Sequence, residues 1–323
     1  MRRLKAVLFT LEFHEWLCIL MVMFLIVLYQ TGLSGWGIGY SIAHIWEEGS
    51  PITKLFFLLL ILLGIVTRFL TAGPIKEFGS FLFRMMGAFM VMLFCFESVI
   101  YFIEERNLPL LDVRLLQWDA WLFGGKQPAE WLEPITTPFL TYILSTVYLL
   151  WFPMVYGTVM LMYIKGKKAV VEYVCFALMT YYIGYLIYLI VPGIGPLYVY
   201  DFSTPIGGLT AMMTEGKLIQ PAADVFPSLH TGISVVMLIQ VWRRYRIWTW
   251  VYGPLTVLII CSTIYLRIHY AVDVFAGIIL SIAIAYLCPF VLRKWEDGRS
   301  KISMPMSTIL ESEHSERLQT MEV

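Results

Sequence analysis

The sequence is poor in charged residues. They make up 14% of its 323 residues, and 23 Lys and Arg balance 23 Asp and Glu, so the formal net charge is +0. A soluble domain carries about 25% charged residues. The balanced charge gives no basic surface for nucleic acid, so we expect no such partner. Hydrophobic residues reach 59% and the mean hydropathy is +0.75, which excludes a globule surrounded by water.

Cysteine and histidine are also scarce, with five residues of each. No cysteine lies in an expected loop, so no disulfide framework is indicated, and no CxxC pair indicates a zinc site. The histidines and carboxylates also form no compact ligand set, so we expect no metal, and we expect no cofactor. All five cysteines fall in long apolar runs and are interpreted as small buried residues: Cys18, Cys95, Cys175, Cys261 and Cys288.

The apolar runs predict the fold class. They are long enough to cross a bilayer core of ~30 Å at about 1.5 Å per helical residue. We therefore predict an all-α integral membrane protein with about eight transmembrane helices. The expected spans are residues 16–33, 54–72, 83–103, 137–164, 170–191, 226–242, 248–266 and 273–292.

Positive charge alternates between the two sides of these spans. Basic clusters precede the first span or follow the second, fourth, sixth and eighth, as in Lys165, Lys167 and Lys168 or in "RRYR" at 243–246. In the link between the third and fourth spans, acidic residues outnumber the basic ones. Cytoplasmic loops carry the excess of Lys and Arg. We therefore expect both termini in the cytoplasm, and the segments "DVFPSLHTG" (224–232) and "IHYAVD" (268–273) on the non-cytoplasmic side.

The chain divides into three parts by composition. Residues 1–82 are expected to hold two N-terminal transmembrane helices, and residues 83–292 a six-helix catalytic core. Within that core, residues 105–135 have acidic residues too often for a span, and their Leu and Trp spacing predicts short helices at the membrane interface. Residues 293–323 are expected to form a polar cytoplasmic tail.

Two histidines lie at the starts of expected spans. His230 is near the start of the sixth, and His269 precedes the eighth by four residues, with Asp273 four residues after it. On a helix, positions i and i+4 share a face, so the carboxylate can hold one imidazole nitrogen and leave the other free to act as a nucleophile. Ionisable groups at membrane depth are functional hypotheses by default. We interpret His230, His269 and Asp273 as catalytic.

The segment before His230 suits a phosphate. Pro227 is compatible with the first turn of a helix, and Ser228 can donate a hydrogen bond to an anion. The free N–H groups of that turn and the helix dipole favour negative charge. This pattern predicts phosphoryl transfer in which His269 attacks phosphorus in line and His230 protonates the departing oxygen.

The two segments resemble the second and third motifs of the phosphatidic acid phosphatase type 2 superfamily. The second motif is Pro-Ser-Gly-His, which Pro227, Ser228 and His230 match, with Leu229 at the Gly position. The third is Ser-Arg, five residues, His, three residues and Asp. It is matched by Ser262, His269 and Asp273. The resemblance covers the six-span core and implies the same roles for the two histidines.

The sequence departs from this family at its cations. Thr263 stands at the Arg position of the third motif, and the first motif, Lys, six residues and Arg-Pro, has no clean counterpart. Arg267 and Lys217 are the candidate substitutes. Asp224 can bind a substrate hydroxyl, although solvation or helix capping is an alternative. The expected substrate-binding residues are Ser228, Arg267, Ser262, Thr263, Lys217 and Asp224.

Ser-Thr, Pro-Ser-Leu-His, His-Tyr-x-x-Asp and "DAWLFGGKQPAEWL" (119–132) together resemble the inositol phosphorylceramide synthase branch. That resemblance implies transfer of a headgroup from a phospholipid donor to a lipid acceptor. A lipid phosphate or polyprenyl pyrophosphate phosphatase, with water as the acceptor, is the nearest alternative. A non-catalytic lipid-binding or transport protein is another.

Other interpretations of the histidines also stay open. His269 and Asp273 could form a structural pair at a helix start. Two histidines could ligate haem, although this leaves Ser228 and Asp273 unexplained. A Ser–His intramembrane protease would need Ser228 in a different local pattern.

Overall fold

The computed structural model describes residues 11–32, 46–47, 51–70, 72–207 and 222–303. Across these ranges the secondary structure is helical and contains no strand. Each of the eight expected spans corresponds to a helix, which confirms the all-α membrane fold. These helices are α2 (Phe13–Gly32), α4 (Pro51–Phe69), α5 (Pro74–Glu105), α8 (Pro138–Tyr163), α9 (Lys167–Tyr188), α12 (Leu229–Arg244), α13 (Arg246–Tyr265) and α14 (Ala271–Ser303).

Six of these helices are long and apolar enough to cross a membrane, namely α2, α5, α8, α9, α13 and α14. α12 has only 16 residues, and Phe57–Phe69 of α4 forms a shorter apolar helical segment. α12 packs against α8, α9, α13 and α14. Because its neighbours surround it, α12 meets little lipid and need not match the thickness of the bilayer.

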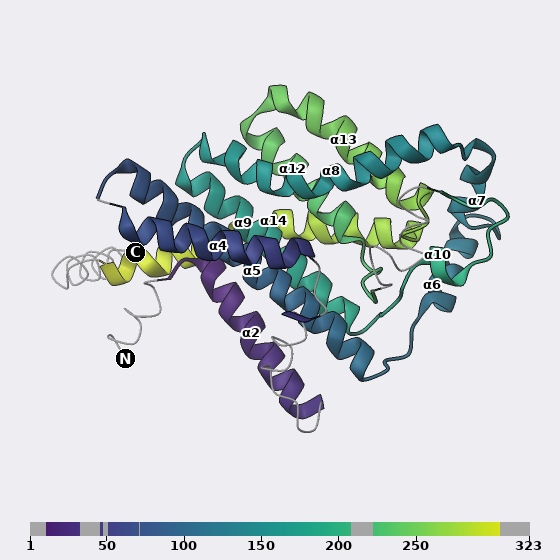
Figure 1. Cartoon of the computed structure of the whole chain (residues 1–323), viewed down its shortest axis with the longest axis horizontal. Helices are drawn as coiled ribbons and strands as arrows, with labels where there is room; N and C mark the ends of the chain where they lie inside the picture. Colours follow the sequence, from purple (N-terminus) through teal and green to yellow (C-terminus); the bar gives the residue numbers. More distant parts are fainter. Residues whose placement is uncertain (1–10, 33–45, 48–50, 71, 208–221, 304–323) are drawn as a thin grey trace, which may run out of the picture.

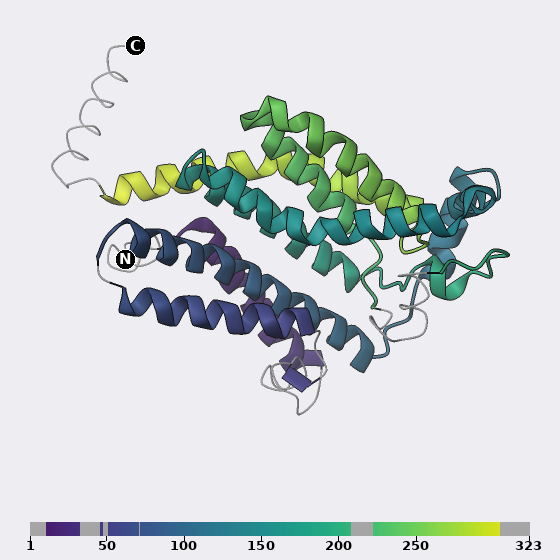
Figure 2. The same cartoon turned by 45° about the horizontal axis from the view of Figure 1, so that its top comes forward.

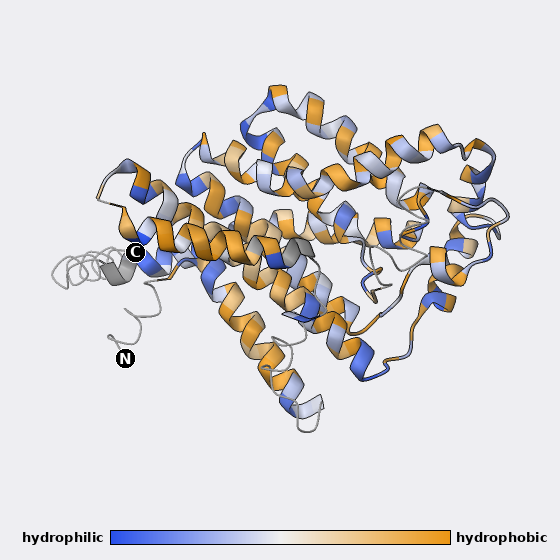
Figure 3. Cartoon of the chain, viewed as in Figure 1, coloured by the Kyte–Doolittle hydropathy of each residue, from blue (hydrophilic) through white to orange (hydrophobic). Residues whose placement is uncertain are grey.

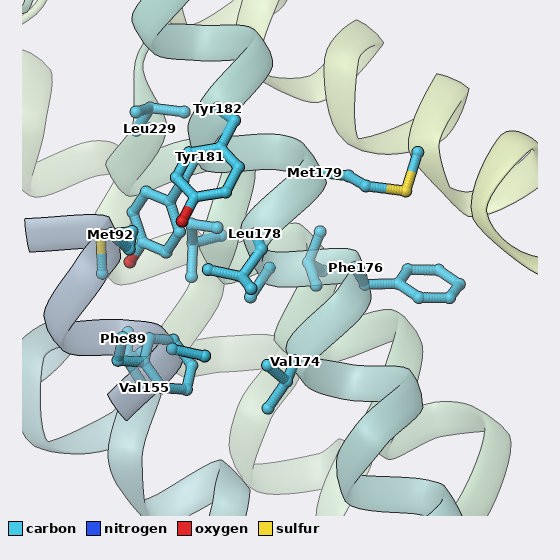
Figure 4. Close-up of a cluster of buried hydrophobic side chains, with 14 of the residues drawn as sticks. Phe89, Met92, Val155, Val174, Phe176, Leu178, Met179, Tyr181, Tyr182 and Leu229 are labelled. Carbon is cyan, nitrogen blue, oxygen red and sulfur yellow. The ribbon is translucent and has the colours of Figure 1, made fainter. Parts of the chain in front are cut away.

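The core is centred on α9. Tyr173, Val174 and Phe176 are fully buried. Figure 4 shows side chains of α9 beside Phe89 of α5 and Val155 of α8. A helix that is apolar on all sides is buried among other helices, and the sequence "YVCFALMTYYIGY" (173–185) has this composition.

The outer faces of the bundle are apolar. Large exposed side chains include Phe139 of α8, Val257 of α13 and Ile279 of α14. In Figure 3 the hydrophobic colours follow α2, α4 and α5, and hydrophilic residues gather in the loops and near helix ends. In a bilayer, this exposed apolar surface is expected to face the lipid.

The start of α2 and the end of α14 lie at the same end of the bundle (Figures 1 and 2). Arg299 contacts Glu12 at 2.8 Å, and Lys168, at the start of α9, contacts Glu296 at 3.0 Å. The basic links between helices therefore lie together at this end, as their alternation along the sequence requires. Which side of a membrane this end faces stays a prediction.

α14 is longer than expected. It continues to Ser303, whereas the predicted span ended at 292 and a polar tail was expected from 293. The added turns pair with other helices, through Arg299 and Glu296 as above and through the ring of Trp295, 5.7 Å from that of Phe13. These contacts explain why a polar segment is helical here.

At the opposite end lie four short helices, α6 (Asp112–Leu122), α7 (Pro128–Leu132), η1 (Glu133–Ile135) and α10 (Pro196–Val199). Figure 1 shows α6, α7 and α10 together at this end. α6, α7 and η1 are the short helices expected from residues 105–135. Their position at a membrane interface stays a prediction.

Candidate active site

Ser228 is the N-cap of α12. Its Oγ accepts a hydrogen bond from the N–H of Thr231 at 3.3 Å, and its carbonyl oxygen accepts one from Gly232 at 2.9 Å. The helix therefore begins two residues after Pro227, which precedes the cap instead of occupying the first turn. In the described part of the chain, the N–H groups of Leu229 and His230 have no acceptor, so they are available to an anion.

His269 lies on the short connection between α13 and α14. Its backbone N–H donates to the carbonyl of Thr263 at 3.2 Å, and the N–H of Ile268 donates to the same oxygen at 3.0 Å. The side chain is 3% exposed. The end of α13 thus fixes the backbone of this histidine.

The two histidines contact each other directly. Nε2 of His269 lies 3.4 Å from Nδ1 of His230, and Nδ1 of His269 lies 3.0 Å from the carbonyl oxygen of Val225. Because a carbonyl only accepts, Nδ1 of His269 carries the proton and Nε2 holds a lone pair. The nucleophilic nitrogen therefore faces His230.

Asp273 supports this arrangement from the first turn of α14. Its Oδ2 lies 3.5 Å from Nδ1 of His269 and accepts a shorter hydrogen bond, 2.7 Å, from the N–H of Tyr270. Its carbonyl oxygen accepts from the N–H of Ser228 at 3.0 Å. The closest partner of the imidazole is thus the carbonyl of Val225, which sequence reasoning could not find because a backbone carbonyl has no residue signature.

Burial keeps His269 neutral. It lowers the pKa of His269 to about 4, against the opposing effects of the Asp224 carboxylate and of the carbonyl of Val225. Burial also raises the pKa of Asp224 to about 6, although the nearby His269 works in the other direction. At neutral pH the site therefore contains an unprotonated imidazole and a carboxylate that titrates near physiological pH.

Aromatic rings of α8 surround His230. The ring centroids of Trp151 and Tyr148 lie 4.5 Å and 4.7 Å from that of His230, and Phe152 lies at 6.2 Å. Nε2 of His230 is buried and has no partner within the described residues. Sequence reasoning interpreted the abundant aromatics as interfacial and packing residues, because nothing in α8 alone connects them with a histidine of α12.

Small residues bring the two motifs together. A Cβ atom at Gly277 of α14 would lie 2.4 Å from the carbonyl oxygen of Ser228, and one at Gly232 would lie 3.3 Å from Thr180. Ser281 donates to the carbonyl oxygens of Gly232 and Gly277, at 2.8 Å and 2.7 Å. Gly277 therefore allows α14 to approach the start of α12 closely, and Gly232 allows α12 to pack closely against α9.

Ser262 and Thr263 are fully buried near the end of α13. Their hydroxyls donate to carbonyls of their own helix, Ser262 to Ile259 at 2.7 Å and Thr263 to Ile260 at 2.8 Å. The carbonyl of Thr263 fixes the backbone of His269, as described above. Substrate binding by these two side chains stays a prediction, and Lys217 lies outside the described residues.

Arg267 contacts the loop beyond α10. Its Nη2 donates to the carbonyl of Thr204 at 2.7 Å and to Oε1 of Glu133 at 3.3 Å, and its guanidinium lies 3.9 Å from the ring centroid of Phe202. Its φ is 63°. The side chain is 4% exposed, and its role as a cation for phosphate stays a prediction.

Two buried carboxylates of α6 also reach this region. Asp119 accepts hydrogen bonds from the N–H groups of Ala271 and Val272, and Asp112 accepts one from the hydroxyl of Tyr270, each at 2.8 Å. Sequence reasoning treated these aspartates only as evidence that the segment does not span the membrane. Their partners lie more than 150 residues away, so no local pattern could identify them.

In the described ranges, no three His, Cys, Asp or Glu side chains come together in a way that could hold a metal ion. A family model of the PAP2 superfamily matches residues 113–287, more than half of the chain. The matched region runs from α6 into α14 and includes both histidines. Comparisons with curated proteins and with solved structures gave no match.

Proposed function

Since the chain belongs to the PAP2 superfamily, whose members are phosphatases or phosphotransferases, we propose that it transfers a phospho-alcohol headgroup between membrane lipids. The observation that supports this most directly is the pair of His269 and His230. Nε2 of His269 is unprotonated and faces Nδ1 of His230 at 3.4 Å, while Val225 holds the other nitrogen of His269.

The first step forms a phosphohistidine. Nε2 of His269 attacks phosphorus, the bond from phosphorus to the diacylglycerol oxygen breaks, and the imidazolium of His230 gives its Nδ1 proton to that oxygen. The negative charge of the bound phosphate favours the imidazolium form of His230. In-line attack requires the leaving oxygen opposite Nε2, so the phosphoryl group enters between the rings and replaces their mutual hydrogen bond.

The second step regenerates the enzyme. The hydroxyl oxygen of the acceptor lipid attacks phosphorus, the bond to Nε2 of His269 breaks, and His230 takes the hydroxyl proton. The free N–H groups of Leu229 and His230, at the positive end of α12, favour the charge that develops on the phosphoryl oxygens. Asp273 and the carbonyl of Val225 orient His269 throughout.

A transferase is favoured over a phosphatase by the scarcity of cations near the histidines among the residues that the structure describes. Thr263 replaces the family's Arg, and Arg267 is occupied by Glu133 and Thr204. A phosphodiester carries less negative charge than a phosphomonoester and needs fewer cations. The motif resemblance to the inositol phosphorylceramide synthase branch supports phosphatidylinositol as donor and ceramide as acceptor. We place the site on the non-cytoplasmic side, since the basic links lie at the other end of the bundle.

Product analysis by mass spectrometry tests this proposal. Purified wild type and His269→Ala are given phosphatidylinositol and phosphatidate, each with and without ceramide or diacylglycerol. We expect an acceptor-linked phosphoinositol lipid that the variant does not make. Phosphate released from phosphatidate without an acceptor would instead indicate a phosphatase. Full turnover by folded His269→Ala would exclude phosphohistidine catalysis at His269. Absence of any product from the wild type with all of these lipids would instead favour a lipid-binding or transport role.

A further inference from the structure

The segment that carries His269 is held by α6 as well as by its own helices. Oδ2 of Asp119 accepts from the N–H of Ala271, and Oδ1 accepts from the N–H of Val272, both at 2.8 Å. Asp119 is 1% exposed. Both of its oxygens are therefore occupied by the backbone immediately after His269.

These contacts replace a conventional helix cap. The first N–H groups of a helix have no acceptor within it, and a residue just before the helix usually supplies one. In α14 the acceptor for Ala271 and Val272 is a carboxylate from a distant part of the chain, while Asp273 takes the N–H of Tyr270. A negative charge here also interacts favourably with the helix dipole.

Asp112 holds the other flank of the same segment. It accepts from the hydroxyl of Tyr270 at 2.8 Å and from the N–H groups of Ile194 and Gly195, at 3.1 Å and 2.9 Å. A Cβ atom at Gly195, whose φ is +97°, would lie 2.5 Å from the carbonyl oxygen of Ile268. The loop at residues 193–195 is thus packed between α6 and the residue before His269.

The site has little freedom to tolerate a shift of this segment. Nε2 of His269 must meet phosphorus while Nδ1 remains bonded to Val225. A misplacement of 1 Å can cost about 10²-fold in rate. We propose that Asp119 and Asp112 are positioning residues, which set the height and orientation of His269 through the backbone of residues 270–272. This inference rests on the proposed phosphohistidine mechanism and adds to it the two side chains on which the geometry of the nucleophile depends.

Asp119→Ala is the direct test, with Gln117→Ala as the matched control, because Gln117 lies on the exposed face of the same helix. Steady-state rates are measured with dioctanoyl phosphatidylinositol or dioctanoyl phosphatidate, whichever the wild type turns over. We expect kcat to fall about 100-fold for Asp119→Ala, with KM changed less than threefold. Asp119→Asn, which retains one acceptor oxygen, should fall about tenfold, and Gln117→Ala should match the wild type.

Amide hydrogen exchange of residues 268–276 gives a readout that does not depend on activity. We expect faster exchange in Asp119→Ala, because Ala271 and Val272 lose their acceptor. Faster exchange with wild-type kcat would overturn the positioning role while leaving the proposed mechanism intact. Full turnover by His269→Ala would instead overturn the mechanism. If Asp119→Ala does not fold, Asp119→Asn decides the question, and wild-type kcat and exchange in that variant would overturn the inference.

Discussion

A Cβ atom at Gly277 would lie 2.4 Å from the carbonyl oxygen of Ser228. This contact joins the helix that follows His269 to the cap that precedes His230. The atom that the new Cβ would meet belongs to the backbone and cannot rotate away. Gly277→Ala therefore has to move α12 away from α14. We expect at least a tenfold loss of kcat, since a small displacement separates the two histidines.

Gly87→Ala is the matched control. Gly87 lies inside α5, and a Cβ atom there would meet nothing within 4 Å. Both substitutions gain about 1 kcal/mol of helix propensity, so any difference between them reports packing. Steady-state kinetics and thermal unfolding of the two variants check the prediction. Equal, wild-type kcat in both would contradict the idea that this contact sets the distance between the motifs.

The two histidines should differ in their dependence on the leaving group. A general acid contributes about 10²–10⁴-fold when the leaving group is a poor one, such as a lipid alkoxide. We expect His230→Ala to lose activity on that scale with dioctanoyl phosphatidate. With a p-nitrophenyl phosphate or phosphodiester, whose leaving group needs no proton, the loss should be less than tenfold. His269→Ala should lose both activities, because no nucleophile remains.

Rates with the two leaving groups, measured side by side for each variant, provide the check. The accumulation of phosphoenzyme, trapped by an alkaline quench because a phosphohistidine hydrolyses in acid, separates the roles further, since it should be absent in His269→Ala. Equal losses for His230→Ala on both substrates would argue that His230 positions the substrate and does not donate a proton.

Hydropathy and local spacing predicted the eight helices and brought His230, His269 and Asp273 to attention, because each of these signals lies within a few residues. Three features of the site could not be predicted in this way, namely the carbonyl of Val225, the aromatic rings beside His230 and the contacts of Asp119. The carbonyl of Val225 has no side-chain signature. The rings of Tyr148 and Trp151 meet His230 only when α8 packs against α12.

The sequence also gave no reason to separate Asp119 from the other acidic residues of its segment, because its partners are backbone groups of α14. Pro227 was expected in the first turn of the helix, but it lies one residue before the N-cap. A serine is a strong N-cap, and Ser228 begins the helix after the proline. The length of α12 could not be predicted from the thickness of the bilayer, because a helix surrounded by protein need not match that thickness.

Substitutions at Arg267 distinguish a structural role of this side chain from a role in binding the substrate phosphate. Its guanidinium is shared between Glu133 and the carbonyl of Thr204. We expect Arg267→Ala to lower the free energy of unfolding by about 1–3 kcal/mol, because these partly buried acceptors lose a charged donor. Glu133→Gln removes the same ion pair without changing residue 267 and should destabilise the protein in the same direction. Arg114→Ala, on the exposed face of α6, should have no effect.

Thermal unfolding in detergent measures these differences, and KM for the lipid distinguishes the alternative. If Arg267 binds phosphate, Arg267→Ala should raise KM about tenfold or more while Glu133→Gln leaves KM unchanged. A loss of stability shared by both variants, with KM unchanged, is the outcome that their contacts favour.

The pH dependence of the reaction should show the titration of two groups, His269 and Asp224. Burial lowers the pKa of His269 to about 4, so the imidazole stays unprotonated and nucleophilic between pH 7 and 5. Phosphoenzyme formation at saturating lipid should therefore remain level over this range and fall only as the pH approaches 4. Burial raises the pKa of Asp224 to about 6, so its carboxylate gains a proton as the pH falls through 6. A protonated carboxyl group accepts hydrogen bonds less well than a carboxylate.

If Asp224 binds a hydroxyl of the headgroup, KM for phosphatidylinositol should rise as the pH falls through about 6, and this inflection should vanish in Asp224→Asn. Phosphatidylinositol is suited to this comparison because its phosphodiester does not titrate near pH 6, whereas the phosphomonoester of phosphatidate does. Asp201→Asn, on an exposed loop, is the control and should retain the wild-type profile. An inflection that persists in Asp224→Asn would assign the titration to another group and leave Asp224 as a capping residue. Its loss in that variant would make Asp224 the residue through which the site recognises a polyol.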